Sequence, residues 1–129
     1  MKLLNKYKKI NPIKWSERNI SSDYGSFNPE FHPLLVEPLN ALADSRGKTV
    51  GLIGSVQHIK TLIAQMWHLY CLHIEPGRAA MYDLTEAALK EFSDDKFTPL
   101  IDSTDAVLNL IPNQPYRRTK FFTSTNFGG

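Results

Sequence analysis

A short run near the middle of the chain carries residue types that bind phosphate, and it reads Gly54-Ser55-Val56-Gln57-His58-Ile59-Lys60-Thr61. A glycine permits a sharp turn, after which consecutive backbone N–H groups point at an anion. A lysine ammonium neutralises the β- and γ-phosphates, and a neighbouring hydroxyl is a ligand for Mg²⁺. The spacing is that of a P-loop. It predicts a nucleotide site with the contact residues Gly54, Ser55, Gln57, His58, Lys60 and Thr61.

One position departs from the P-loop pattern, because Ile59 stands where a second glycine lets the backbone approach the phosphates. If that position requires a positive φ, the branched side chain costs about 1–3 kcal/mol. A glycine-bearing turn followed by Lys-Thr also occurs by chance in other α/β proteins. Two interpretations therefore stay open: a loop that binds ATP, with Mg²⁺ on Thr61, or a purely structural turn.

The elements that must position this run are a strand before it and a helix after it. Residues 49–53 form an apolar, β-branched run that predicts a buried strand. Apolar residues at three- and four-residue spacing predict a helix over residues 61–74, covered on several sides. Residues 78–84 predict a second strand. A strand, helix and strand in this order predict an α/β fold with a partial P-loop NTPase-like parallel sheet and flanking helices.

The start of the chain has a different character, because prolines at positions 12, 29, 33 and 38 interrupt it. We expect residues 1–38 to form an irregular N-terminal arm with little regular structure, anchored by apolar side chains such as Trp15. Residues 39–129 then form a truncated P-loop ATPase-like α/β domain. Pro38 suits the first turn of a short helix that runs to about Ala43.

The second half of the chain carries clear helix signals. Thr85 is a suitable N-cap with Glu86 in the first turn of its helix. Pro99 predicts a kink or a restart of that helix. Residues 103–105 predict a turn or cap before a short helix over residues 106–111, and the apolar pair at 121–122 predicts one more strand.

Several other residues carry side chains that could form a chemical site. His68, Cys71 and His73 lie close together in sequence, but the 100° step of a helix places residues 71 and 73 about 140° apart, which favours a buried helix with incidental histidines over a metal site. Asp83 resembles a strand-end acid for Mg²⁺, but its position favours capping of the next helix. We assign no catalytic residue.

Composition sets broad limits on the protein. The 129 residues carry a net charge of +2, with 42% hydrophobic residues, and predict one domain. The single cysteine and the lack of an apolar run of about 20 residues favour a cytoplasmic protein with no membrane segment. Lysines crowd the first fourteen residues, and residues 116–122 mix aromatic and basic side chains. Either segment could contact nucleic acid, although a solvated terminus and an edge strand are the simpler interpretations.

Taken in order, several segments resemble the ATPase portion of the phage DNA-packaging terminase large subunit, the GpA-type family. The similarity covers about residues 13–122. The segments that carry it are Ile13-Lys14-Trp15-Ser16-Glu17-Arg18, Phe31-His32-Pro33, the helix from Val36 to Ala43, the loop from Gly54 to Thr61, Lys96-Phe97-Thr98-Pro99-Leu100-Ile101 and the stretch from Asp105 to Ile111. The family's loop reads Gly-Ser/Ala-x-Gln-x-Gly-Lys-Thr.

The resemblance implies a function. Lys60 and Thr61 would contact ATP and Mg²⁺, the region from Tyr24 to Pro33 would lie near the adenine, and the host cytoplasm would be the location. The family powers the packaging of viral DNA into a procapsid, so phage DNA and other terminase or portal components would be partners.

The chain also departs from the family, whose members are several times longer and carry a Walker B acid pair and a nuclease. We therefore expect a truncated ATPase fragment that is inactive alone, with its missing C-terminal half possible in an adjacent reading frame. Whether the chain is an enzyme stays open. The alternative is a non-catalytic remnant or interaction module of a phage or prophage packaging complex, and a small nucleotide kinase would need acidic and lid residues that the sequence does not offer.

Overall fold

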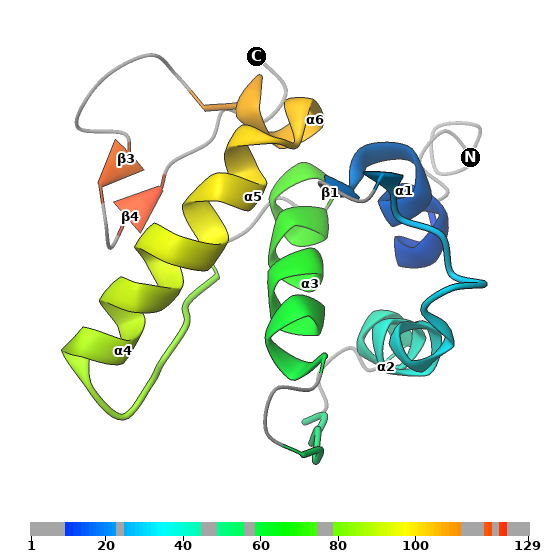
Figure 1. Ribbon diagram of the computed structural model, residues 1–129, viewed down its shortest axis with the longest axis horizontal. Coiled ribbons are helices and arrows are strands. Elements are labelled where there is room, and N and C mark those ends of the chain that lie inside the picture. Colours follow the sequence, from blue (N-terminus) through cyan, green and yellow to red (C-terminus); the bar gives the residue numbers. More distant parts are fainter. Residues whose placement is uncertain are drawn as a thin grey trace, which may run out of the picture.

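Helix α3, Lys60–Ile74, is the element against which helices α1, α2 and α6 pack (Figure 1). The structure is a computed structural model that describes residues 10–22, 25–44, 49–55, 59–74, 79–111, 118–119 and 122–123. Ile63, Met66, Leu69 and Tyr70 are buried on α3 at helical spacing, which confirms the helix predicted over residues 61–74. The core continues from α3 into its neighbours. Its buried apolar residues are Ile13, Trp15, Ile20, Phe27, Leu35, Leu39, Ile63, Met66, Leu69, Tyr70, Ile101 and Val107.

The prediction of little regular structure before Pro38 was wrong, because helix α1, Pro12–Asn19, lies there. The side chain of Asn11 accepts a hydrogen bond from the backbone N–H of Ile13 at 2.8 Å, and a proline begins the helix. This is a normal helix start, since proline fixes a helical φ where no N–H is needed. The Asn11 amide also donates to Asn40 at 2.9 Å, which joins the start of α1 to α2.

Helix α2, Pro33–Asp44, begins earlier than predicted and contains Pro38 in its interior. Pro33, rather than Pro38, occupies the first turn. Pro38 lacks the N–H that would bond to the carbonyl of Leu34. Leu34 lies on the exposed side of α2, while Leu35 and Leu39 are buried and hold the helix against the core.

The strands in the described part of the chain form two short antiparallel pairs. β1, Ser21–Ser22, pairs with β2, Gly25–Ser26, with Ser21 opposite Ser26. Gly25 has a φ of 107°, which glycine adopts without strain. β3, Arg118–Thr119, pairs with β4, Phe122–Thr123, close to the strand predicted in the tail.

A rod of consecutive helical segments lies beside α3: α4, Glu86–Glu91, then the π-helix η1, Phe92–Phe97, and α5, Thr98–Asp102 (Figure 1). Thr85 caps α4 as predicted, since its hydroxyl accepts from the N–H of Ala88 at 3.1 Å. Pro99 stands in the first turn of α5, directly after the π-helix, which confirms a restart there. Helix α6, Asp105–Leu108, is shorter than the predicted helix over residues 106–111.

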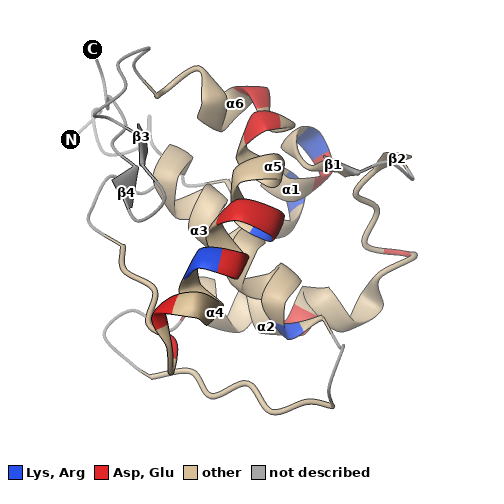
Figure 2. Cartoon of the chain, turned by 60° about the vertical axis from the view of Figure 1, so that its left-hand side comes forward, with Lys and Arg blue, Asp and Glu red and all other residues tan. Residues whose placement is uncertain are grey.

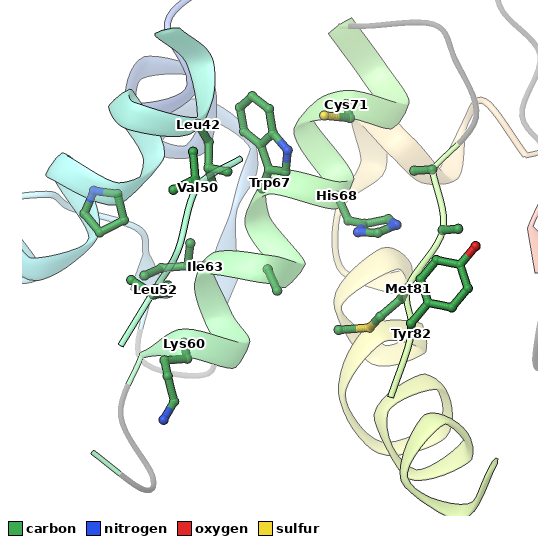
Figure 3. A pocket seen from close by; sticks show the side chains of 14 residues that line it. Leu42, Val50, Leu52, Lys60, Ile63, Trp67, His68, Cys71, Met81 and Tyr82 are labelled. Carbon is green, nitrogen blue, oxygen red and sulfur yellow. The ribbon is translucent and has the colours of Figure 1, made fainter. Parts of the chain in front are cut away.

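The predicted α/β fold with a parallel P-loop sheet was wrong. Residues 49–55 and 79–83 run without any strand assignment, and the described strands pair only in the two antiparallel hairpins. A parallel strand satisfies its backbone N–H and C=O groups only through a neighbouring strand. Here Val50 and Leu52 lie on one side of α3, and Met81 and Tyr82 lie on the other (Figure 3). The two segments therefore do not pair with each other.

Candidate functional site

The start of α3 brings part of the predicted phosphate loop together. The Nζ atom of Lys60 donates to the carbonyl oxygen of Gly54 at 2.6 Å and to that of Ser55 at 3.1 Å. Thr61 follows in the first turn of α3 and is half-buried. The other two predicted contacts, Gln57 and His58, lie outside the described residues. The structure thus places Gly54, Ser55 and Lys60 in direct contact, six residues apart or fewer in sequence.

The helix end adds positive potential to this junction. The first N–H groups of any α-helix have no partner within the helix, and its dipole places a partial positive charge there. The N–H of Ile63 is bonded to the carbonyl of Ile59 at 2.9 Å, so the N–H groups of Lys60, Thr61 and Leu62 are the ones without an intrahelical partner. The first turn contains no acidic residue that would neutralise this end. An anion is therefore favoured at the junction.

The surroundings of Gly54 would also accommodate a larger residue. A Cβ added at Gly54 would lie 3.7 Å from both Cγ and Cδ of Lys60, which is ordinary van der Waals contact, and among the described glycines a positive φ is found only at Gly25. Ile59 departs from the P-loop pattern, but it has a structural role in this fold. Its side chain is half-buried and packs against the core. This packing gives a reason for an apolar residue at position 59.

A groove of about 460 Å³ opens beside the junction and runs along α3 (Figure 3). Its walls are α2, the two extended segments and the face of α3 that carries Trp67 and His68. The lining residues are Pro38, Leu42, Val50, Leu52, Lys60, Ile63, Ala64, Trp67, His68, Cys71, Ala79, Ala80, Met81 and Tyr82. Sequence reasoning missed this groove, because its walls come from segments that only the tertiary fold brings together.

Three large apolar side chains in or next to the extended segments beside α3 are strongly exposed. Ile53 is 100% exposed, Leu84 is 99% exposed and Tyr82 is 89% exposed. Isolated apolar residues on a surface need no explanation, but Ile53 and Tyr82 belong to the two extended segments that flank α3, and Leu84 directly follows the second. Apolar side chains that the sequence analysis expected to be buried in strands are therefore exposed to solvent.

The histidines of α3 point toward different elements. His68 packs edge-on against Phe97 of η1, with ring centroids 5.5 Å apart, and burial lowers its pKa. The Nδ1 atom of His73 accepts a hydrogen bond from the indole N–H of Trp15 in α1 at 2.8 Å. The part of the chain that the structure describes contains no group of three or more potential metal ligands. Asp83 is exposed, and its carboxylate accepts from the N–H of Leu84 at 2.6 Å.

Acidic residues dominate the rod of α4, η1 and α5 together with the short helix α6 that follows it (Figure 2). They are Glu86, Glu91, Asp94, Asp95, Asp102 and Asp105, against Lys90 and Lys96. This rod would repel the phosphates of a nucleic acid. None of the described helices is long and apolar enough to span a bilayer.

Comparison with known proteins identifies one match. The family model for the ATPase domain of the phage terminase large subunit gpA matches residues 21–129, which include the loop–helix junction at Lys60, α3 and the residues that line the groove. Neither a curated protein nor a solved structure matches the chain.

Proposed function

Because the chain belongs to the ATPase-domain family of the phage terminase large subunit gpA, as its sequence motifs predicted, we propose that it binds ATP at the loop–helix junction. The triphosphate would lie against Gly54, Ser55, Lys60 and Thr61. The observation that carries this proposal is the position of the Lys60 ammonium, held by two loop carbonyls at the N-terminal end of a 15-residue helix.

The chemistry of the junction suits a polyphosphate. The Lys60 ammonium would exchange its two carbonyl acceptors for phosphate oxygens, which form stronger charge-assisted hydrogen bonds. The first N–H groups of α3 would bind a further oxygen. The hydroxyl of Thr61 is the protein ligand that we assign to Mg²⁺, because this cation keeps most of its positions for water and phosphate oxygens. In this proposal the residues bind and orient the nucleotide.

Substitution of Lys60 by alanine tests the site. We expect the wild-type chain to bind a fluorescent ATP analogue in the presence of Mg²⁺, with affinity reduced at least about tenfold in Lys60→Ala, which corresponds to about 1.4 kcal/mol. Lys90→Ala is the matched control, because Lys90 is an exposed lysine on α4 that takes no part in the junction. Equal binding by wild type and Lys60→Ala, or no binding by either, would remove the nucleotide proposal.

The Mg²⁺ assignment has a separate test. Thr61→Val should weaken binding only when Mg²⁺ is present, while Thr61→Ser should retain it, because serine keeps the hydroxyl. The same loss for Thr61→Val in EDTA and in Mg²⁺ would show that the hydroxyl is not a metal ligand. Inactivity of the isolated chain stays a prediction, and release of inorganic phosphate from ATP, lost in Lys60→Ala, would contradict it.

A second function in the same packaging complex is favoured by the exposed apolar residues Ile53, Tyr82 and Leu84. Under this alternative the chain is a non-catalytic interaction module. The family implies association with phage DNA and packaging components in general. We propose that any DNA contact lies away from the acidic rod of α4 to α6. Failure of both wild type and Lys60→Ala to bind nucleotide would leave this alternative as the better account.

A further inference from the structure

The first helix is joined to the end of α3 by a hydrogen bond between two aromatic side chains. The indole N–H of Trp15 donates to Nδ1 of His73 at 2.8 Å, and the two ring centroids are 5.9 Å apart. Trp15 is 1% exposed, and it also packs edge-on against Tyr70, with centroids 5.8 Å apart. Trp15 therefore anchors α1 in the core, and the hydrogen-bond acceptor for its indole N–H is one imidazole nitrogen of His73.

The direction of this hydrogen bond fixes the protonation state of His73. Nδ1 can accept only while it carries no proton, so the neutral ring has its hydrogen on Nε2. If Nδ1 is protonated, two N–H groups face each other and the indole N–H loses its acceptor. We propose that this hydrogen bond is a pH-sensitive latch, and that protonation of His73 at Nδ1 releases α1 from α3.

Among the described residues, no charged side chain is paired with His73 in a way that would affect its protonation. The charged side chains on the elements that pack against α3 are Lys14, Glu17 and Arg18 of α1, Glu37 and Asp44 of α2, and Asp105 of α6, and all of them are exposed. The π-helix η1, whose Phe97 packs on His68, carries the charged residues Asp94, Asp95 and Lys96. None of these groups lies within ion-pair distance of His73 among the described contacts. Burial, rather than a neighbouring charge, lowers the pKa of His73.

A second tie between the same elements does not titrate in this range. The hydroxyl of Tyr70 donates to the carbonyl oxygen of Ile10 at 2.8 Å, just before α1. A phenol with a pKa near 10 stays protonated at neutral and acidic pH. Release of the latch should therefore loosen α1 while α3 keeps its fold, which separates local opening from acid unfolding of the whole protein.

The test follows the fluorescence of Trp15 in a Trp67→Phe background, where it is the single tryptophan. Between pH 7.5 and pH 5 we expect the emission maximum to shift to longer wavelength, while far-ultraviolet circular dichroism keeps its helical signal. His73→Asn is the decisive variant. The Oδ1 atom of asparagine occupies nearly the place of Nδ1, accepts the same hydrogen bond and does not titrate, so the shift should be abolished.

Three outcomes would overturn the latch. They are a shift that persists in His73→Asn, no shift in the parent protein, and a shift that coincides with loss of the helical signal. A Trp15→Phe variant gives a second measurement that does not depend on fluorescence. By nuclear magnetic resonance the pKa of His73 should rise toward its ordinary value in Trp15→Phe, because the indole N–H that favours an unprotonated Nδ1 is gone, and an unchanged His73 pKa would equally refute the proposal.

Discussion

Replacing the hydroxyls of Ser103 and Thr104 together should destabilise the protein by more than the sum of the two single replacements. Both hydroxyls donate to the same acceptor, the carbonyl oxygen of Leu100 near the end of α5, at 3.0 Å for Ser103 and 2.7 Å for Thr104. The nearby backbone N–H groups bond elsewhere, that of Ser103 to Pro99 and that of Thr104 to Ile101. The two side chains are therefore alternative partners for one helix-end carbonyl.

The expected magnitudes follow from this redundancy. Ser103→Ala or Thr104→Val alone removes one hydrogen bond, worth about 0.5–1.5 kcal/mol, but leaves the carbonyl with a partner. Thr104 is fully buried, and valine keeps its volume, so no cavity is added. In the double variant the carbonyl of half-buried Leu100 loses both side-chain partners, and the penalty for an unsatisfied acceptor, about 1–3 kcal/mol when it is buried, applies here near its lower end. We expect a coupling free energy of about 1 kcal/mol between the two positions.

Urea unfolding of the four proteins measures this coupling. The free energy of unfolding comes from linear extrapolation, and an unchanged m-value shows that the unfolded state is the same in all four. Thr104→Ser is the control, because it keeps the hydroxyl and loses only a methyl group. Additivity of the single effects within about 0.5 kcal/mol would refute the shared-acceptor argument.

Three further predictions concern the core, the junction and pH. Ser16→Ala should raise the free energy of unfolding by about 1 kcal/mol, because the Ser16 hydroxyl is buried without a hydrogen-bond partner. Gly54→Ala should change that free energy by less than about 0.5 kcal/mol, since its Cβ meets Lys60 at ordinary contact distance; urea unfolding tests both, and a large loss in either would contradict the geometry. Burial lowers the pKa of His68 and of His73 in the folded protein. Below about pH 6.5 the unfolded state therefore binds more protons than the folded state, and the free energy of unfolding decreases as the pH is lowered. His68→Gln should reduce the loss between pH 7.5 and pH 5.5, and an undiminished loss would exclude His68 as a source.

Signals confined to neighbouring residues were predictable from the sequence. The apolar spacing of α3, the cap at Thr85 and the restart at Pro99 each depend on side chains within one or two helical turns. The sequence pattern placed Gly54 and Lys60 in one candidate phosphate loop, but it did not predict the hydrogen bond from the Lys60 ammonium to the Gly54 carbonyl.

Features that join distant segments were not predictable in the same way. Apolar, β-branched residues at 49–53 favour extended backbone whether or not a partner strand is beside them, so the pattern could not show that the described part of the chain has no parallel sheet. The groove requires α2, α3 and two extended segments at once. The hydrogen bond between Trp15 and His73 joins residues 58 positions apart, and nothing in the sequence around either residue indicates its partner.

The exposed side chains of Ile53, Tyr82 and Leu84 have a practical consequence for the choice of assay. Reporter dyes that fluoresce on hydrophobic surfaces should bind the native protein here, so a dye-based melting curve would begin from a high baseline and understate the transition. At the concentrations used for spectroscopy, the same side chains favour self-association. Intrinsic signals recorded at several dilutions are therefore the sounder way to follow this molecule.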